Sequence, residues 1–200
     1  MSVQETVPVD GLRERKKERT RDAIRDAAHD LFIERGFPGT TIDDIAAAAD
    51  VSPRTFFRYF ASKEEVLFSR FDETLDLLRE FLDSRPAGEP VIVSLREASE
   101  QFATLGDDVS ADPRTFDLFR ANEALHARYL QSFFRLEAMA AEWIATRTDL
   151  PPEDVLPRTL GAVLASGARV ALDAWVAQPG SDLKTLLEPS LSMIDAALAR

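Results

Sequence analysis

Cysteine is absent from this 200-residue chain, and the only histidines are His29 and His126. Without cysteine there is no disulfide, no thiolate metal ligand and no cysteine nucleophile. The histidines lie 97 positions apart (126 − 29), and no HExxH, GxSxG or P-loop spacing occurs. We therefore expect no metal site, no cofactor and no enzymatic activity. An α-helical enzyme is the alternative from another functional class.

Long apolar runs, repeats and strand patterns are also missing. The apolar runs fall short of the ~18 residues that a membrane span requires. The first ten residues are acidic and lack an apolar stretch, so we expect no signal peptide. These absences predict a cytoplasmic, all-α protein with no membrane partner.

The net charge of −11 is unexpected for a partner of nucleic acid until it is divided along the chain. Residues 1–70 hold 12 basic and 13 acidic side chains (net −1), and residues 71–200 hold 12 and 22 (net −10). Attraction to phosphate depends on local charge, screened over ~10 Å. A basic cluster precedes position 22: Arg13, Arg15, Lys16, Lys17, Arg19 and Arg21. This balance suits a sequence-specific DNA reader and excludes a non-specific coat protein.

Residues 40–66 read as two short helices, a tight turn and the start of a third helix. Thr40 and Thr41 each precede an acid by three residues, which is the spacing of a capping box. Asp50 stands at the turn, where a left-handed backbone is expected. Ser52 caps the second helix, and Pro53 suits its first turn. The pattern predicts a helix-turn-helix.

The second short helix has two different faces. At 100° per residue, Phe56, Tyr59 and Phe60 fall on one side. The opposite side carries Arg54, Phe57 and Arg58. Arginines suit phosphates and guanine edges, and an exposed ring suits a thymine methyl. A solvated helix with chance arginines is the alternative reading.

These residues resemble the DNA-binding domain of the tetracycline-repressor (TetR) family, whose motif is Val-Ser-x-x-Thr-Phe/Leu-Tyr-x-Tyr/His-Phe-x-x-Lys. Here it stands as Val51, Ser52, Thr55, Phe56, Phe57, Arg58, Tyr59, Phe60 and Lys63. Phe57 replaces the usual tyrosine, and the Phe-Phe-Arg-Tyr-Phe variant resembles a subgroup of the family. With the helix faces, the resemblance implies these contacts with a double-stranded DNA operator: Thr41, Ser52, Pro53, Arg54, Thr55, Phe57, Arg58, Tyr59 and Lys63.

The rest of the chain predicts about nine helices in all, divided into two domains. We expect a disordered tail over residues 1–11, a helix-turn-helix DNA-binding domain over 12–66, and a ligand-binding and dimerisation domain over 67–200. Helices are expected over 12–35, 62–83, 91–105, from 113, 122–148, 153–177 and from about 182, with an acidic loop over 107–112.

Aromatic residues are concentrated in the second domain, as in an apolar small-molecule site, although ordinary core is the alternative. The expected effector residues are Phe102, Phe116, Phe119, Arg120, Asn122, His126, Phe133, Trp143 and Trp175. The aromatics with Arg120 and Arg135 favour an apolar, anionic ligand such as a fatty-acyl compound. The arginines could instead pair with surface carboxylates.

The last two helices resemble the pair that forms the dimer interface in TetR-like regulators, and small residues there permit close helix approach. The expected interface residues are Leu160, Val163, Leu164, Gly167, Leu187, Leu191, Ile194 and Leu198. Packing within one subunit is the alternative. The resemblance implies a homodimeric repressor released from its operator by ligand. An activator or a corepressor-dependent regulator would have the same sequence features.

Overall fold

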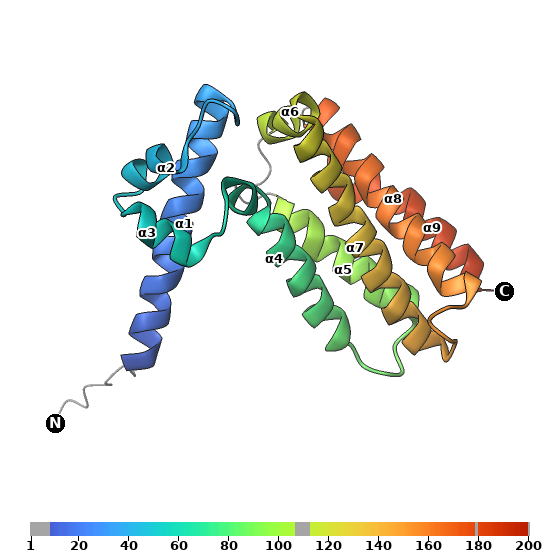
Figure 1. Ribbon diagram of the computed structural model, residues 1–200. Coiled ribbons are helices and arrows are strands. Elements are labelled where there is room, and N and C mark those ends of the chain that lie inside the picture. Colours follow the sequence, from blue (N-terminus) through green and yellow to red (C-terminus); the bar gives the residue numbers. More distant parts are fainter. Residues whose placement is uncertain (1–8, 107–112, 179, 200) are drawn as a thin grey trace. The chain divides into compact units, whose positions relative to one another are not determined.

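The computed structural model describes residues 9–106, 113–178 and 180–199. These residues form nine α-helices and no strand, which confirms the expected all-α class (Figure 1). The chain divides after Ser69 into two compact units. The division falls inside α4 (Lys63–Asp83), so this helix contributes to both units.

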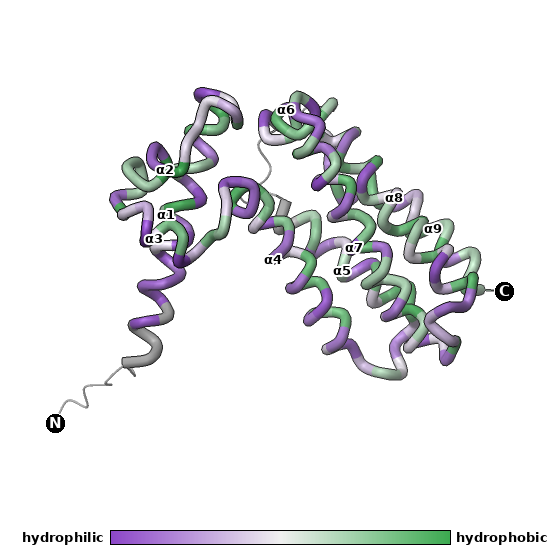
Figure 2. The backbone as a smooth tube through the Cα atoms, in the orientation of Figure 1, coloured by the Kyte–Doolittle hydropathy of each residue, from purple (hydrophilic) through white to green (hydrophobic). Residues whose placement is uncertain are grey.

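The first unit consists of α1 (Val9–Arg35), α2 (Ile42–Ala48), α3 (Pro53–Tyr59) and the start of α4. Helix α1 begins three residues earlier than expected, and residues 1–8 of the predicted tail lie outside the described chain. Ile24 and Phe32 of α1 are buried in the core of this unit. After its first turn, α1 is strongly hydrophilic in Figure 2, over the stretch that holds the basic cluster.

Two predicted turns of the first unit are confirmed. Gly36 ends α1 with φ +74°, and Asp50 takes φ +53° between α2 and α3. Thr41 is the N-cap of α2, as expected. The expectation for Thr40 was wrong, because Thr40 is fully buried and its hydroxyl donates to the carbonyls of Leu31 and Gly36 at 3.1 and 3.0 Å. Its hydroxyl therefore binds the end of α1 and does not cap α2.

The second unit contains the rest of α4 and five further helices: α5 (Val91–Gly106), α6 (Pro113–Ala121), α7 (Glu123–Thr148), α8 (Val155–Ala177) and α9 (Leu183–Leu198). Helices α7, α8 and α9 run side by side, and the short α6 lies at one end of them (Figure 1). Asn122, Asp154 and Asp182 cap α7, α8 and α9 with their side chains. The predicted acidic loop over 107–112 lies outside the described residues.

Helix α8 qualifies as a membrane span by length and composition alone. It does so although Arg158, Arg169 and Asp173 interrupt its apolar residues. Core helices meet the same criterion, and α8 packs against both α7 and α9. The criterion is therefore weak support for a membrane span here.

Two glycines allow α8 to pack closely against α7 and α9. A Cβ on Gly161 would lie 2.7 Å from the Glu137 carbonyl oxygen of α7, and one on Gly167 would lie 2.4 Å from the Ser190 Cβ of α9. Side chains at these positions would separate the helices. The small residues of α8 thus serve packing within the subunit.

We predict that Gly161→Ala lowers the free energy of unfolding by about 1–3 kcal/mol, because the added methyl meets backbone that cannot move aside. The gain in helix propensity of about 1 kcal/mol opposes this but is smaller. Urea denaturation followed by circular dichroism measures the change. Gly88→Ala is the control, since nothing lies within 4 Å of its added Cβ. Equal stability of the two variants would contradict the close approach of α7 and α8.

Candidate nucleic-acid interface and effector site

Helix α3 is anchored by two phenylalanines. Phe56 and Phe60 are 0% and 1% exposed, and their ring centroids lie 6.0 Å apart. The Ser52 hydroxyl accepts a hydrogen bond from the Thr55 N–H at 3.1 Å, and Pro53 occupies the first turn. The cap and the buried rings together fix which side of α3 faces outward.

The outward side of α3 carries the three residues expected there. Phe57 is 56% exposed, and Arg54 and Arg58 are also exposed. Among the described residues neither arginine pairs with a carboxylate, and the Arg58 guanidinium lies 5.1 Å from the centroid of the half-buried Tyr59 ring. Two cations without carboxylate partners and one apolar ring are thus presented to solvent, as contact with a polyanion requires.

Two predicted contact hydroxyls take part in local caps. The Thr41 hydroxyl donates to Asp44 at 2.5 Å and accepts from the Asp44 N–H at 3.1 Å. The bond from the Thr41 hydroxyl to the carboxylate, and then the bond from the Thr41 N–H to the same carboxylate, hold the pKa of Asp44 below its ordinary value. The Thr55 and Ser52 hydroxyls lie 3.0 Å apart. The primary effect of the Thr41 and Ser52 hydroxyls is to stabilise the first turns of α2 and α3.

Lys63 also has partners inside the first unit. Its ammonium donates to the carbonyls of Phe37 and Thr40 at 2.7 and 2.9 Å and lies 4.3 Å from the centroid of the Phe37 ring. These contacts tie the start of α4 to the turn between α1 and α2. Lys63 therefore stabilises the turn on which α2 and α3 rest, a role that the sequence did not indicate.

The predicted effector residues are divided among several environments. Phe116, Phe119 and Phe133 surround Tyr129, with ring centroids 5.9, 5.2 and 5.0 Å from its own. Tyr129 was absent from the predicted set. A buried aromatic that carries a polar atom is the signal by which it could have been found.

The Tyr129 hydroxyl is buried and has no hydrogen-bond partner among the described residues. Burial raises its pKa well above the ordinary value, and the nearby negative charge of Asp173 adds to the shift. Asp173 pairs with Arg169 at 3.2 Å and with Arg120 at 3.6 Å. Tyr129 is thus a hydrogen-bond donor held in its neutral form at one end of the second unit.

Four other predicted effector residues have structural partners or lie at the surface, so their joint role in binding one ligand stays a prediction. Asn122 caps α7, and Arg120 is an exposed member of the Asp173 ion pairs. The Trp143 indole N–H donates to the Leu82 carbonyl at 3.0 Å. His126 is exposed, and Arg135 pairs with Asp72.

Phe102 is the only predicted effector residue on a small apolar hollow of the second unit. We call this hollow the inner chamber. It measures about 30 Å³, and helices α4, α5, α7, α8 and α9 contribute to it. Its lining includes Leu78, Leu82, Phe102, Leu136, Met139 and Leu164. Trp175 is half-buried on α8 and does not line the chamber.

The predicted interface residues need a correction as well. Four of them are buried inside the subunit and cannot offer surface to a partner: Leu160, Leu187, Leu191 and Ile194. Val163, Leu164, Gly167 and Leu198 are half-buried. The apolar side chains that α8 and α9 expose are instead Val170 and Met193, together with Val155 and Leu156 at the start of α8.

Within the described residues no group of three or more histidine, aspartate or glutamate side chains could hold a metal ion. The described residues form a cationic and aromatic surface on α3 and a largely apolar interior in the second unit.

Known protein families match both parts of the chain. Residues 24–69 match the bacterial regulatory proteins of the tetR family, and residues 89–199 match the MftR C-terminal domain. The HTH-type transcriptional regulator TcmR of Streptomyces glaucescens is 34% identical over 93% of this chain and 86% of its own length. MftR of Mycobacterium tuberculosis, a regulator assigned to mycofactocin biosynthesis, is 27% identical over 93% of this chain and 94% of its own.

A solved structure of similar sequence is FadR of Thermus thermophilus, a TetR-family transcriptional repressor in complex with lauroyl-CoA. It is 28% identical, superposes with a TM-score of 0.61, and covers 87% of this chain and 92% of its own.

We predict that Tyr129→Phe stabilises the protein by about 1 kcal/mol at neutral pH, because it removes a buried hydroxyl without a partner. The folded-state pKa lies above the unfolded value of about 10, so stability present below that pH is lost as the pH rises past it. Tyr129→Phe should remove this alkaline loss.

Urea denaturation at several pH values between neutral and alkaline measures both effects. Tyr59→Phe is the matched control, since the chain has only two tyrosines. It should leave the alkaline loss unchanged. An identical pH dependence in wild type and Tyr129→Phe would contradict the assignment.

Proposed function

The chain belongs to the TetR family of bacterial regulatory proteins, and from this premise we propose that α3 reads an operator and that a small acyl-type ligand in the second unit releases the protein from it. Membership makes the chain a DNA-binding transcriptional regulator and not an enzyme. The similarity to FadR, a repressor, supports the proposal that this regulator represses transcription. We also propose that it acts in the cytoplasm, where its DNA is.

The observation that carries the proposal is the exposure of Arg54, Phe57 and Arg58 beside the buried Phe56 and Phe60. A seven-residue helix gains nothing in stability from exposing a phenylalanine, so the arrangement fits a binding surface. In the Phe-Phe-Arg-Tyr-Phe subgroup that we propose, the Phe57 ring would pack on a thymine methyl where the family's tyrosine offers a hydroxyl.

The division of the chain into two compact units suits two separate functions, DNA binding and ligand binding. We propose that the first unit is the DNA-binding domain and that the second binds ligand and forms the dimer. One helix-turn-helix reads too few base pairs to be selective, so two copies must bind half-sites about 34–36 Å apart. A ligand that favours another position of α4 would change this spacing, with a coupling of about 1–3 kcal/mol.

A gel shift with DNA from upstream of the protein's own gene tests the function directly. We expect a discrete complex that survives excess non-specific DNA. A smear that competitor abolishes would contradict sequence-specific binding.

We predict that Arg54→Ala reduces the preference for operator over random DNA by about 1–3 kcal/mol, because it removes a contact to base edges. Lys63→Ala should weaken binding to both DNAs by a similar factor, because it loosens the support of α2 and α3. Fluorescence anisotropy with an operator selected from random-sequence DNA measures both effects. Equal losses on operator and random DNA for Arg54→Ala would contradict its role.

The dimer surface that we propose is the exposed apolar face of α8 and α9. Val170 and Met193 are 56% and 65% exposed, and the half-buried Val163 and Leu198 belong to the same two helices. Exposed apolar side chains on neighbouring helices are typical of an interface between copies.

We predict that Val170→Glu and Met193→Glu each raise the dimer dissociation constant at least about tenfold, since a charge would be buried without a partner. Sedimentation equilibrium measures the constant. Leu77→Glu is the control, because Leu77 is 50% exposed on α4, a helix outside the proposed face. Dissociation by Leu77→Glu, or none by the other two, would remove α8 and α9 as the interface.

A further inference from the structure

The first half of α1 extends past α2 and α3 (Figure 1). The helix begins at Val9, but its buried side chains, among the described residues, begin at Ile24. At 1.5 Å per residue, the stretch before Ile24 reaches about 22 Å beyond the core. Arg13 and residues 15–19 are exposed. We call residues 13–21 the α1 arm. A helix segment that covers no core is suited to contact a partner outside the subunit.

The α1 arm is strongly cationic. It holds six basic side chains and two acids, Glu14 and Glu18, so its net charge is +4 (6 − 2). Residues 1–70 as a whole have a net charge of −1. Because exposed charges act over only about 10 Å at ordinary salt concentrations, a polyanion is attracted to the arm although the surrounding sequence is not basic.

The basic side chains of the arm divide between two faces. Arg13 and Lys17 precede Ile24 by eleven and seven positions, so each lies within about 20° of the buried Ile24 around the helix. We call this side the core-side face, because α2 packs against α1 where Ile24 is buried. Arg15 and Arg19 lie about 180° and 140° from Ile24, on the opposite face. The helical period thus directs Arg13 and Lys17 to the side of the helix-turn-helix.

Arg21 connects the core-side face with α3. Its guanidinium lies 4.7 Å from the centroid of the Phe60 ring, and Phe60 is the C-cap of α3. The exposed Arg58 stands in the last turn of the same helix. Lys17 and Arg13 follow at about 6 and 12 Å from Arg21 along α1. Basic side chains therefore continue from the end of α3 over a length of three to four base pairs, at about 3.4 Å each.

The spacing of this row does not favour the helix itself. Arg13, Lys17 and Arg21 follow one another at intervals of four residues. Like charges at this spacing destabilise a helix by about 0.2–0.5 kcal/mol per pair. Phosphates placed along the row would relieve the repulsion. The row is therefore better explained by binding of a polyanion than by folding.

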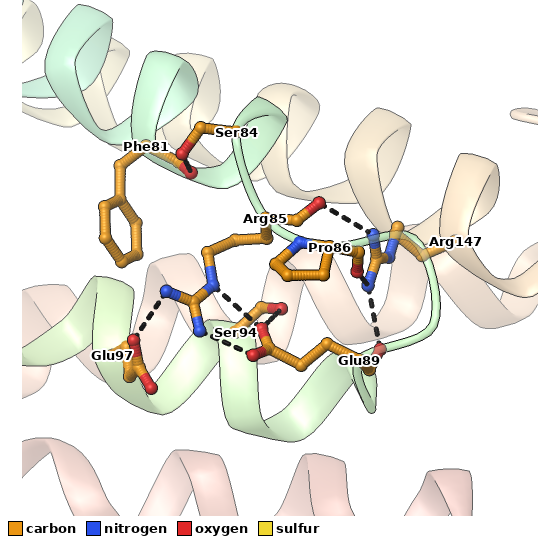
Figure 3. A network of polar contacts seen from close by, with 8 residues as sticks. All are labelled: Phe81, Ser84, Arg85, Pro86, Glu89, Ser94, Glu97 and Arg147. Carbon is orange, nitrogen blue, oxygen red and sulfur yellow. Dashed lines mark hydrogen bonds and ion pairs between the residues drawn. The ribbon is translucent and has the colours of Figure 1, made fainter.

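Arginines of the second unit, by contrast, have partners within that unit. Arg85 donates to the Glu89 carboxylate at 2.8 and 2.6 Å and pairs with Glu97 at 2.6 Å (Figure 3). Arg147 donates to the carbonyls of Pro86 and Glu89 at 2.6 and 2.8 Å (Figure 3). Other arginines of this unit also pair with carboxylates: Arg79, Arg96, Arg128 and Arg135. These cations stabilise the second unit.

The arm and α3 share the opposite property. Within the described chain no carboxylate pairs with Arg13, Arg15 or Arg19. The same is true of Arg54 and Arg58 on α3. Among the described residues, cations without carboxylate partners are thus concentrated on these two helices of the first unit. This distribution indicates that one polyanion contacts both.

We propose that the core-side face of the α1 arm is a second DNA contact, in which Arg13 and Lys17 bind backbone phosphates next to the bases that α3 reads. Such contacts add affinity without sequence preference, because phosphates carry no base information. The inference rests on the operator recognition by α3 proposed above and adds a second element with a different kind of contact.

Fluorescence anisotropy of the full-length protein at several salt concentrations tests the inference, with a selected operator and with random DNA of equal length. Arg13→Gln combined with Lys17→Gln removes the core-side charges. Arg15→Gln combined with Arg19→Gln is the matched control, because it removes the same charge from the opposite face of the same arm. Arg13→Lys combined with Lys17→Arg keeps both charges. Thermal unfolding followed by circular dichroism should be the same for all variants, since these side chains are exposed.

We expect the core-side variant to bind operator and random DNA more weakly by the same factor, at least about tenfold at about 50 mM salt. Its plot of log K against log salt should be flatter by about 3–4, because a dimer loses four phosphate contacts at about 0.9 each. The opposite-face variant should lose less than about threefold and keep a slope near that of wild type. The charge-keeping variant should bind like wild type, because lysine and arginine both bind phosphate.

Three outcomes would overturn the inference and leave reading by α3 intact. These are equal losses for the two faces, no loss for the core-side variant, or a loss on operator with none on random DNA. Failure of wild type to prefer operator over random DNA would instead contradict the proposed function.

Discussion

Burial of Phe56 and Phe60 is the interaction on which the proposed reading surface depends. A seven-residue helix is unstable alone, and each buried ring contributes about 1.5–3 kcal/mol that holds α3 in the first unit. Because successive residues of a helix are rotated by 100°, fixing these two rings fixes every other side chain of α3. Arg54 and Phe57 face solvent as a consequence of core packing, because the buried rings decide which side of α3 is turned outward.

Helix α4 belongs to both units, so it connects the second unit with the unit that carries α3. Its first residue, Lys63, is bonded to two carbonyls of the turn between α1 and α2. Its last turns are tied to α7 through the Trp143 indole and the Leu82 carbonyl, and through Arg79 and Glu142 at 2.9 Å. A ligand changes a distant site only by its differential affinity for two states. A helix bonded to both units is an element on which such a preference can act.

The apolar pattern of α8 and α9 shows what helical periodicity can and cannot predict about the residues of a dimer interface. A heptad-like stripe identifies the buried face of a helix but not the chain that covers it. Leu160 and Leu191 follow the stripe, and they are buried by other helices of the same subunit. Val170 and Met193 lie off the stripe and are left exposed. The choice of α8 and α9 as the dimer helices stays a prediction, but half of the residues predicted to form the interface lie on the buried faces of these helices.

The sequence by itself determined the helices, the Thr41 and Ser52 caps and the left-handed Asp50, because these depend on residues within about four positions of one another. It also determined the outward set on α3, since the helical period decides it. Only the tertiary structure decided the partners of Lys63, 26 positions from Phe37, and of Trp143, 61 positions from Leu82. It also decided the isolation of the Tyr129 hydroxyl. Such contacts depend on which segments meet in the folded chain, and no local pattern of residues encodes that.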